Sequence, residues 1–279
     1  MKKLLYLLLT CVLCSALVFT ACSKDSKEQP DEAAEATEAA VTQEQIEKSI
    51  IGTWIKSEVD GQPALTNEKT VFDIVSTTEA YESASRTDGA TPFAYNDEAD
   101  IDINGNVVTI TLTNPNPDVK SVVHEFAITG ISDSEFTANR KFTRTIEGAD
   151  PYINEEVVTY TKVNDNYSYD IIGKWEGRCT SEGSVFDDGQ DHRWEFKDDG
   201  TYIYYVKKGD DWVPADAAEG DYFVAGNLLC GRWFEGKTEN REWWDIAIDG
   251  DTMNWTALRE NEEDGSTFTA SFEMKKVEE

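Results

Sequence analysis

The sequence predicts an all-β protein of two tandem, small antiparallel up-and-down β-barrels that follow a signal peptide and an acidic tether. The first supporting observation is the phrase Ile-Ile-Gly-x-Trp, which occurs at 50–54 and again at 171–175. The second is that each copy opens roughly a hundred residues of alternating apolar and polar positions broken by turn signals. Short strands without long helical patterns favour barrels, because closure removes sheet edges that would otherwise aggregate.

The N-terminus has the layout of a secretory signal peptide. Lys2 and Lys3 precede an apolar run at 4–17, which is shorter than the ~20 residues that a membrane-spanning helix needs. The segment 19–22, Phe-Thr-Ala-Cys, resembles the lipobox of bacterial lipoproteins, in which the cysteine is acylated and becomes the new N-terminus. We therefore predict a signal peptide over 1–21 and a lipid anchor on Cys22, since two or more acyl chains attach stably to a membrane. An ordinary signal peptide cut nearby is the alternative.

Residues 22–45 are predicted to form a disordered acidic tether, because they are polar and contain no aromatic residue. Ile46 and Ile50 lie four apart and predict a short helix whose apolar edge packs on the folded body. The chain has 25 basic and 55 acidic residues, and loss of two lysines with the signal lowers its net charge from −30 to −32. Such a charge repels phosphate backbones, so nucleic acid is not an expected partner.

The first predicted domain covers 46–165. Alternation and apolar runs predict strands at 53–57, 71–75, 101–112, 122–128, 135–142 and 157–163. Asn104-Gly105 between alternating hydrophobic residues predicts a hairpin, and 145–154 is interpreted as a polar loop. Asp100 and Asp102 begin like a calcium-binding loop, but the strand-like flanks favour the hairpin, and no metal site is predicted.

The second predicted domain covers 166–279 and repeats this plan. Strands are predicted at 194–196, 201–206, 220–224, 228–230, 243–248, 252–258 and 267–274. The segment 136–140 of the first domain matches 255–259 of the second, and both domains close on Lys-Val. We interpret the two domains as the product of a duplication.

These residues carry a family resemblance. Gly-x-Trp at the start of a first strand, followed by a meander of strands and a terminal basic residue, resembles the lipocalin superfamily, in particular the small lipocalin-like domains of bacterial lipoproteins. In that family the tryptophan packs at the closed end of the barrel under a basic side chain from the last strand. The resemblance implies that Trp54 meets Lys162 and that Trp175 meets Lys275 or Lys276, so any ligand enters at the other end. The barrel-floor residues so implied are Gly52, Trp54, Lys162, Gly173, Trp175 and Lys276.

Seven of the eight tryptophans lie in the second domain. They indicate either an aromatic cavity for a small apolar or glycan ligand, or a barrel core packed solid with large side chains. Trp212 and Trp233 lie near predicted loops. Adjacent Trp243 and Trp244 must point to opposite faces of a strand, so one of them faces solvent or the neighbouring domain. The candidate ligand-binding residues are Trp212, Trp233 and Trp244.

The folded body retains two cysteines, Cys179 and Cys230. In an oxidising compartment they either pair as a disulfide or remain as two buried thiols. Cys179 with His192 is the one conceivable nucleophile pair, but a disulfide or a buried thiol explains this cysteine better. The sequence contains no catalytic constellation, His-Cys metal spacing or Gly-rich phosphate loop, so we expect neither enzyme activity nor a cofactor.

The expected function is that of a lipid-anchored binding protein of the outer membrane, on its periplasmic or outer face, with a small apolar or glycan ligand. The alternative is a structural or assembly lipoprotein with filled barrels. Such a protein would contact another envelope protein through an exposed patch that contains Trp243 or Trp244.

Overall fold

The computed structural model describes residues 40–84, 93–113, 115, 119–181, 188–261 and 264–278. The elements of the first half are α1 (Gln43–Ser49), β1 (Gly52–Val59), β2 (Gln62–Pro63), the 3-10 turn η1 (Thr66–Glu68), β3 (Thr70–Ile74), β4 (Glu79–Ala84), β5 (Ala94–Asn104), β6 (Val107–Leu112), β7 (Val119–Ile131), β8 (Glu135–Ile146) and β9 (Tyr152–Val163). Those of the second half are β10 (Gly173–Cys179), β11 (His192–Phe196), β12 (Thr201–Lys208), β13 (Asp211–Ala225), β14 (Leu228–Glu235), β15 (Thr238–Asp249), β16 (Thr252–Glu260) and β17 (Thr267–Val277). The predicted signal peptide, Cys22 and the tether up to residue 39 lie outside the described residues.

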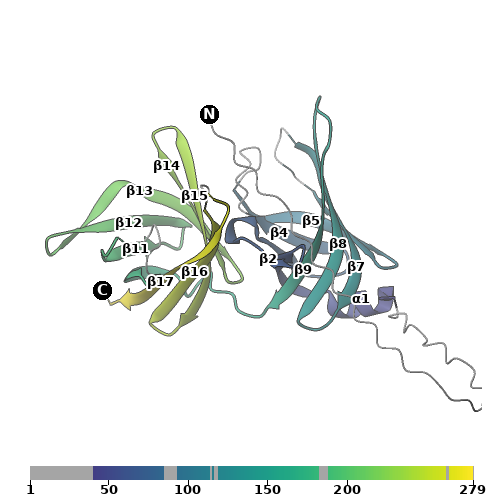
Figure 1. Ribbon diagram of the computed structural model, residues 1–279, viewed down its shortest axis with the longest axis horizontal. Coiled ribbons are helices and arrows are strands. Elements are labelled where there is room, and N and C mark those ends of the chain that lie inside the picture. The colour runs from purple at the N-terminus through teal and green to yellow at the C-terminus, as the bar shows by residue number, and fades with distance from the viewer. Residues whose placement is uncertain are drawn as a thin grey trace, which may run out of the picture. The chain divides into compact units, whose positions relative to one another are not determined.

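Each half of the chain is a closed antiparallel barrel of eight strands. In the first, β1 and β3 to β9 pair in sequence order, and β9 pairs back with β1, while the two-residue β2 pairs only with β1. In the second, β10 to β17 pair in order and β17 pairs with β10 (Figure 1). The prediction of an all-β fold with two tandem barrels is confirmed.

The short helix α1 precedes the first barrel, as predicted. Thr42 and Gln45 form a capping box, in which the Thr42 hydroxyl accepts from the Gln45 amide and the Gln45 side chain accepts from the Thr42 amide. Ile46 and Ile50 are 0% and 1% exposed, so the expected apolar edge is buried in the barrel core. The helix begins at Gln43, within the segment that the sequence assigned to the tether.

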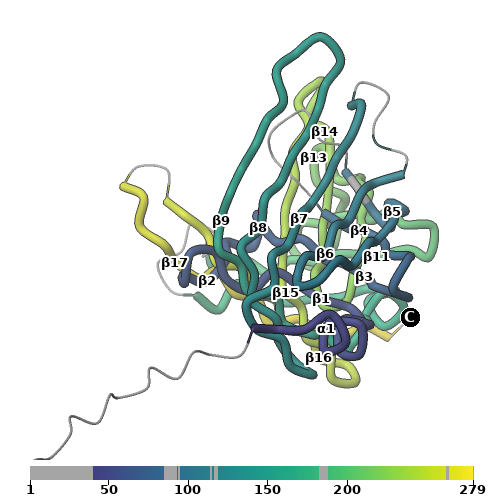
Figure 2. Tube along the Cα trace, turned by 90° about the vertical axis from the view of Figure 1, so that its right-hand side faces the viewer, coloured from purple at the N-terminus to yellow at the C-terminus, as the bar shows by residue number. Residues whose placement is uncertain are grey.

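Two hairpins of the first barrel test the turn predictions. The hairpin at Asn104-Gly105 is confirmed, and Gly105 takes the left-handed conformation at its tip, with φ 62°. The predicted loop at 145–154 is wrong, because β8 and β9 stay paired as far as Arg144 and Tyr152 and leave only 147–151 as the turn (Figure 2). The Arg144 guanidinium lies 5.4 Å from the Tyr152 ring centroid, a cross-strand contact that supports the exposed ladder.

The sequence match between 136–140 and 255–259 is displaced by two residues from the structural equivalence. Phe136 pairs with Tyr160, two residues before the floor lysine of the last strand. In the second barrel the equivalent lysine is Lys276, and the residue two positions before it, Met274, pairs with Met253. A shift of two residues keeps every side chain on the same face of the sheet, so the apolar pattern alone cannot detect it.

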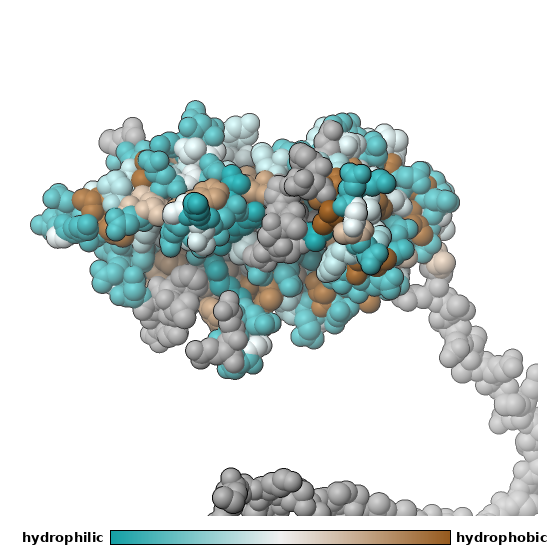
Figure 3. All heavy atoms as spheres, turned by 90° about the horizontal axis from the view of Figure 1, so that it is seen from above, coloured by the Kyte–Doolittle hydropathy of each residue, from teal (hydrophilic) through white to brown (hydrophobic). Residues whose placement is uncertain are grey.

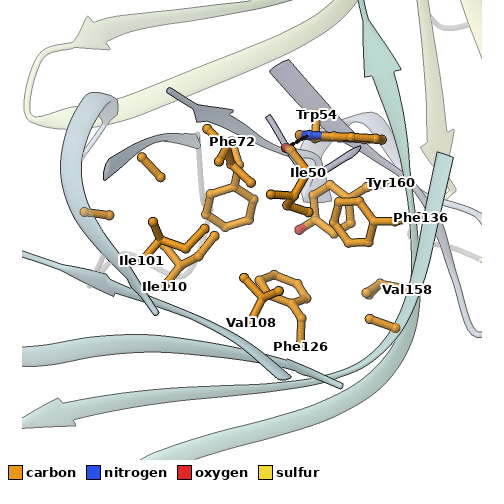
Figure 4. Packing of buried hydrophobic residues seen from close by; sticks show 14 of the residues in the cluster. Ile50, Trp54, Phe72, Ile101, Val108, Ile110, Phe126, Phe136, Val158 and Tyr160 are labelled. Atoms are coloured by element: carbon orange, nitrogen blue, oxygen red, sulfur yellow. Dashed lines mark hydrogen bonds between the residues drawn. The ribbon is translucent and has the colours of Figure 1, made fainter. Parts of the chain in front are cut away.

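The first barrel has an aromatic core next to its floor. Trp54, Phe136 and Tyr160 lie together, with the Trp54 and Phe136 ring centroids 5.0 Å apart and Phe136 stacked on Tyr160 at 4.9 Å (Figure 4). The second barrel has a separate cluster centred on Trp175, Trp255 and the last two strands. The face of the molecule seen in Figure 3 is largely hydrophilic, in keeping with the excess of acidic residues.

Candidate functional site

Trp175 forms the closed end of the second barrel and is fully buried. Its indole Nε1 donates to the carbonyl oxygen of Ile171 at 2.6 Å, and Lys276 Nζ lies 5.2 Å from its ring centroid. Gly173 has φ 127°, and a Cβ at this position would lie 3.1 Å from Lys276 Cε. Glycine suits this position for two reasons: it adopts the positive φ, and it leaves room for the Lys276 side chain. Of the two lysines that the resemblance offers, the structure places Lys276 over the ring.

The floor of the first barrel repeats this arrangement. Trp54 Nε1 donates to the Ile50 carbonyl oxygen at 2.6 Å, and Lys162 Nζ lies 4.9 Å from the Trp54 ring centroid. Gly52, with φ 135°, is crossed by the Lys162 side chain. The floors of the two barrels therefore have the same construction. A difference in ligand binding between the barrels must arise in the lumen beyond the floor.

Beyond its floor, the first barrel is filled by buried charged side chains. Glu156 Oε1 lies 2.5 Å from an Arg140 guanidinium nitrogen and 3.6 Å from Lys56 Nζ. Arg140 also contacts His124 Nδ1 at 3.1 Å, and His124 Nε2 lies 3.4 Å from Glu82 Oε1. Burial alone would raise the pKa of Glu156, but Lys56 and Arg140 outweigh it and lower that pKa. This network occupies the lumen and satisfies its own charges.

The second barrel has small residues where the first has the largest members of this network. Strand register, counted from the floor, defines three equivalent positions. The first position follows the floor tryptophan by two residues. The second precedes the floor lysine by six residues. The third is the residue that pairs with the second position on the neighbouring strand. The pairs at these positions are Lys56 and Gly177, Glu156 and Ala270, and Arg140 and Ala257. Three long charged side chains are thus replaced by one hydrogen and two methyl groups.

The second barrel contains a cavity of about 330 Å³, and none of these three small residues is among the residues that line it. It lies beyond Trp194, whose strand partner is Trp175, and reaches His192, whose strand partner is Gly177. It is therefore displaced from the floor toward the opposite end, where the resemblance places ligand entry. Its lining residues are Asp188, His192, Trp194, Tyr202, Tyr204, Asp216, Ala217, Trp233, Glu235, Glu242, Trp244 and Phe272.

The structure brings two of the three candidate tryptophans together. Trp233 and Trp244 both line the cavity. Trp212 does not, because it packs between the Arg193 guanidinium, at 4.6 Å from its ring centroid, and Lys207 Nζ, at 5.6 Å. Its position near a loop did not predict a place in the cavity, because the Arg193 and Lys207 side chains pack against its ring.

Trp243 and Trp244 point to opposite faces of β15, as the sequence requires. Trp244 belongs to the interior cluster, whereas Trp243 belongs to a cluster with Cys230 and Phe223 of its own barrel and Ile55 of the first. The two tryptophans are 6% and 3% exposed respectively. Neither one therefore supplies the exposed patch that the assembly alternative would use.

Sequence reasoning missed the polar lining of the cavity, above all Glu242. This residue precedes Trp244 by two on β15 and so shares its inward face, a signal that strand alternation already contained. Trp194 and Tyr204 were assigned to core or strand, and they form the opposite wall with ring centroids 4.9 Å apart. His192 was considered only as a partner for Cys179.

Glu242 is the carboxylate set deepest among the cavity's aromatic side chains. Its Oε1 lies 3.9 Å from an Arg259 guanidinium nitrogen, and its Oε2 accepts from Trp244 Nε1 at 3.4 Å. Burial raises the pKa of this carboxyl, and the opposing effects of Arg259 and the indole hydrogen bond do not cancel the rise. Glu242 is therefore an incompletely compensated charge that faces the cavity.

His192 and Tyr204 form a second polar feature of the wall. His192 Nδ1 lies 2.8 Å from the Tyr204 hydroxyl, and its Nε2 lies 3.2 Å from Asp188 Oδ1. Burial raises the pKa of Tyr204 and of Tyr202 above the ordinary tyrosine value, so both phenols are neutral at physiological pH. The cavity can therefore offer ring faces, two phenol hydroxyls and carboxylate oxygens to a ligand.

The two cysteines are free thiols in the structure. Cys179 Sγ lies 3.1 Å from Ser181 Oγ, whereas Cys230 is fully buried beside Trp243. Burial raises the pKa of the Cys230 thiol well above its ordinary value, which suppresses the thiolate form that reacts. Neither cysteine lines the cavity.

Comparison with known proteins assigns no family. No family model and no curated relative matches the chain. Among solved structures, the crystal structure of a protein of unknown function from the DUF3598 family of Nostoc punctiforme aligns with 83% of this chain and 97% of its own, at 9% identity and a TM-score of 0.26. At this level the likeness assigns neither a family nor a function.

Proposed function

We propose that this protein is a lipid-anchored binding protein of the bacterial cell envelope that holds a small ligand in its second barrel. The observation that carries the proposal is the aromatic cavity of about 330 Å³, which falls at the lower end of the range for small-molecule sites. The first barrel, whose lumen is occupied by its own ion network, serves as scaffold. The ligand stacks an apolar or planar group on Trp194, Trp233 and Trp244.

Attachment to the outer membrane through Cys22 belongs to the same proposal and is supported by the sequence of the N-terminal segment. In the part of the chain that the structure describes, no helix is both long and apolar enough to span a membrane. A lipid on Cys22 would keep the acidic body near a bilayer whose anionic surface repels it.

Binding of a neutral apolar fluorophore such as N-phenyl-1-naphthylamine tests the cavity. We expect saturable binding at one site, and we expect Trp233→Ala to weaken it about two- to tenfold through the lost ring contact. Trp212→Ala is the matched control, because it removes a tryptophan from the same barrel outside the cavity, and it should leave the affinity unchanged. Equal loss in both variants, or a wild type that binds no fluorophore, would contradict a ligand site in the lumen.

Acylation is tested by Cys22→Ser. We expect this variant to incorporate no radiolabelled palmitate and to move from the membrane fraction to the soluble fraction, because it lacks the thiol that carries the diacylglycerol. Protease treatment of intact cells with the unaltered protein distinguishes the periplasmic face from the outer face. A Cys22→Ser protein that stays labelled and membrane-bound would refute the anchor.

A further inference from the structure

We propose that the cavity of the second barrel selects an organic cation: an amine or quaternary ammonium group on a compact apolar body. The inference rests on the proposed function, because it names the chemical class of the ligand held in the same cavity. Two independent properties of the wall support it, its charge and its rings, and the lumen of the first barrel provides an internal comparison.

The charge of the wall is one-sided. The described residues that line the cavity include four carboxylates and one histidine, but no lysine or arginine. The carboxylates are those of Asp188, Asp216, Glu235 and Glu242. His192 already contacts Asp188 and the Tyr204 hydroxyl, so it is not directed at a ligand anion. A fatty acid or another anion would enter a field of its own sign, whereas a cation would be drawn in.

The rings of the wall suit the same ligand. Trp194, Trp233, Trp244, Tyr202 and Tyr204 surround the lumen, and an electron-rich ring face attracts a cation within about 6 Å of its centroid. Cages of such rings are a recurrent means of holding quaternary ammonium groups. The combination of several rings with a carboxylate between them distinguishes this cavity from one lined by aliphatic side chains.

The wall already uses this chemistry on one of the protein's own cations. The Arg259 guanidinium lies 4.6 Å from the Trp244 ring centroid and 3.9 Å from Glu242. Arg259 is outside the cavity lining, whereas Trp244 and Glu242 both belong to it. A ligand cation would occupy the side of this pair opposite Arg259.

The first barrel shows how this protein itself places cations in a lumen. There, the protein places two cations of its own, Lys56 and Arg140, in the lumen with Glu156 between them. The Arg140 guanidinium also lies 5.1 Å from the Phe142 ring centroid. The second barrel has Gly177 and Ala257 at these positions, outside the cavity lining, and its cavity wall carries carboxylates and rings without a lysine or arginine.

A small recess shares part of its wall with the cavity. A recess of about 20 Å³ lies against Trp194, Glu242, Trp244 and Trp255. Trp255 is 2% exposed, and its indole N–H has no hydrogen-bond partner among the described residues. A recess of this size holds one water molecule.

Three soluble probes of nearly equal shape test the charge preference: choline, its neutral carbon analogue 3,3-dimethylbutan-1-ol, and the anion 3,3-dimethylbutanoate. Titration calorimetry on the wild-type protein should show choline binding about tenfold or more tighter than the alcohol, which is about 1.4 kcal/mol. The anion should give no detectable binding. Alcohol binding equal to or tighter than choline binding overturns the cation inference and leaves the cavity function intact.

Glu242→Gln tests the carboxylate with little change of shape. Choline affinity should fall about tenfold while alcohol affinity is unchanged, because only the charge is removed. Glu273→Gln, which removes the same charge from an exposed position on β17, should leave both affinities unchanged. Glu235→Gln, at the exposed edge of the cavity, should lower choline affinity about threefold and provides the test if Glu242→Gln does not fold.

The outcomes separate the two proposals. Fluorophore binding without choline binding, or choline binding that neither glutamate substitution weakens, overturns the cation inference alone. Failure of the fluorophore and of all three probes overturns the proposed function as well.

Discussion

Replacing Arg140 with alanine is expected to lower the free energy of unfolding of the first barrel by about 3–5 kcal/mol. The substitution removes the closest partner of Glu156 and a contact of His124, and it leaves a buried carboxylate with Lys56 at 3.6 Å. An uncompensated buried charge costs far more than the ion pair itself contributes. Urea-dependent hydrogen exchange read by mass spectrometry would localise the loss to peptides from 52–163.

Lys141→Ala is the matched control for this prediction. Lys141 neighbours Arg140 and pairs with Glu125 at 3.4 Å, but both side chains are nearly half exposed. Its removal should cost about 1 kcal/mol or less. Equal destabilisation by the two substitutions would show that the network is not what holds the lumen together, and peptides from 173–277 serve as an internal reference in both experiments.

The network also fixes the sign of a pH effect. The folded-state pKa of Glu156 is lowered, so its contribution to stability is fully present above the pKa of the unfolded chain and is lost as pH falls through the folded-state value. The difference in stability between wild type and Arg140→Ala should therefore shrink on acidification. A difference that grows in acid would contradict the assignment.

Replacing Trp175 with alanine is expected to lower the free energy of unfolding of the second barrel by about 3–5 kcal/mol. The side chain is fully buried, so the change leaves a cavity at the floor and removes the ring beneath Lys276. It also leaves the Ile171 carbonyl oxygen without the indole donor that lies 2.6 Å away. Urea unfolding followed by far-ultraviolet circular dichroism measures the loss, because this signal does not depend on the deleted indole.

Trp212→Ala controls for the removal of a large aromatic side chain from the same barrel. Trp212 packs against Arg193 and Lys207 outside the lumen, and its loss should cost about 1 kcal/mol or less. If Trp212→Ala destabilised the protein as much as Trp175→Ala, the floor would have no special role.

Much of the candidate site was visible in the sequence, but its wall was not. The sequence offered Trp233, near a predicted loop, and Trp244, in a doublet, as candidates, and both line the cavity. Trp212 also lies near a predicted loop but does not line the cavity. Position near a loop does not show which other side chains cover a residue. Strand alternation places Glu242 on the same face as Trp244, but the sequence does not show which of the 55 acidic residues lines a cavity.

The sequence by itself determined the number of barrels and the short helix before the first, and the resemblance to lipocalin-like domains implied the two floors. The number of barrels and the helix depend on local patterns: period-two alternation, turn residues, and apolar residues four apart. The signal and lipid attachment were likewise predicted from a contiguous segment, and they remain predictions.

Only the tertiary structure decided which barrel is open. The cavity is lined by residues such as His192, Glu242 and Phe272, which are far apart in the chain and come together only when the barrel closes. A shift of two residues leaves the inward and outward faces unchanged, so the apolar pattern does not fix which side chains share a level of the lumen. The volume of a lumen depends on the combined size of the inward-facing side chains at the same height in the barrel. These side chains come together only after the barrel has formed.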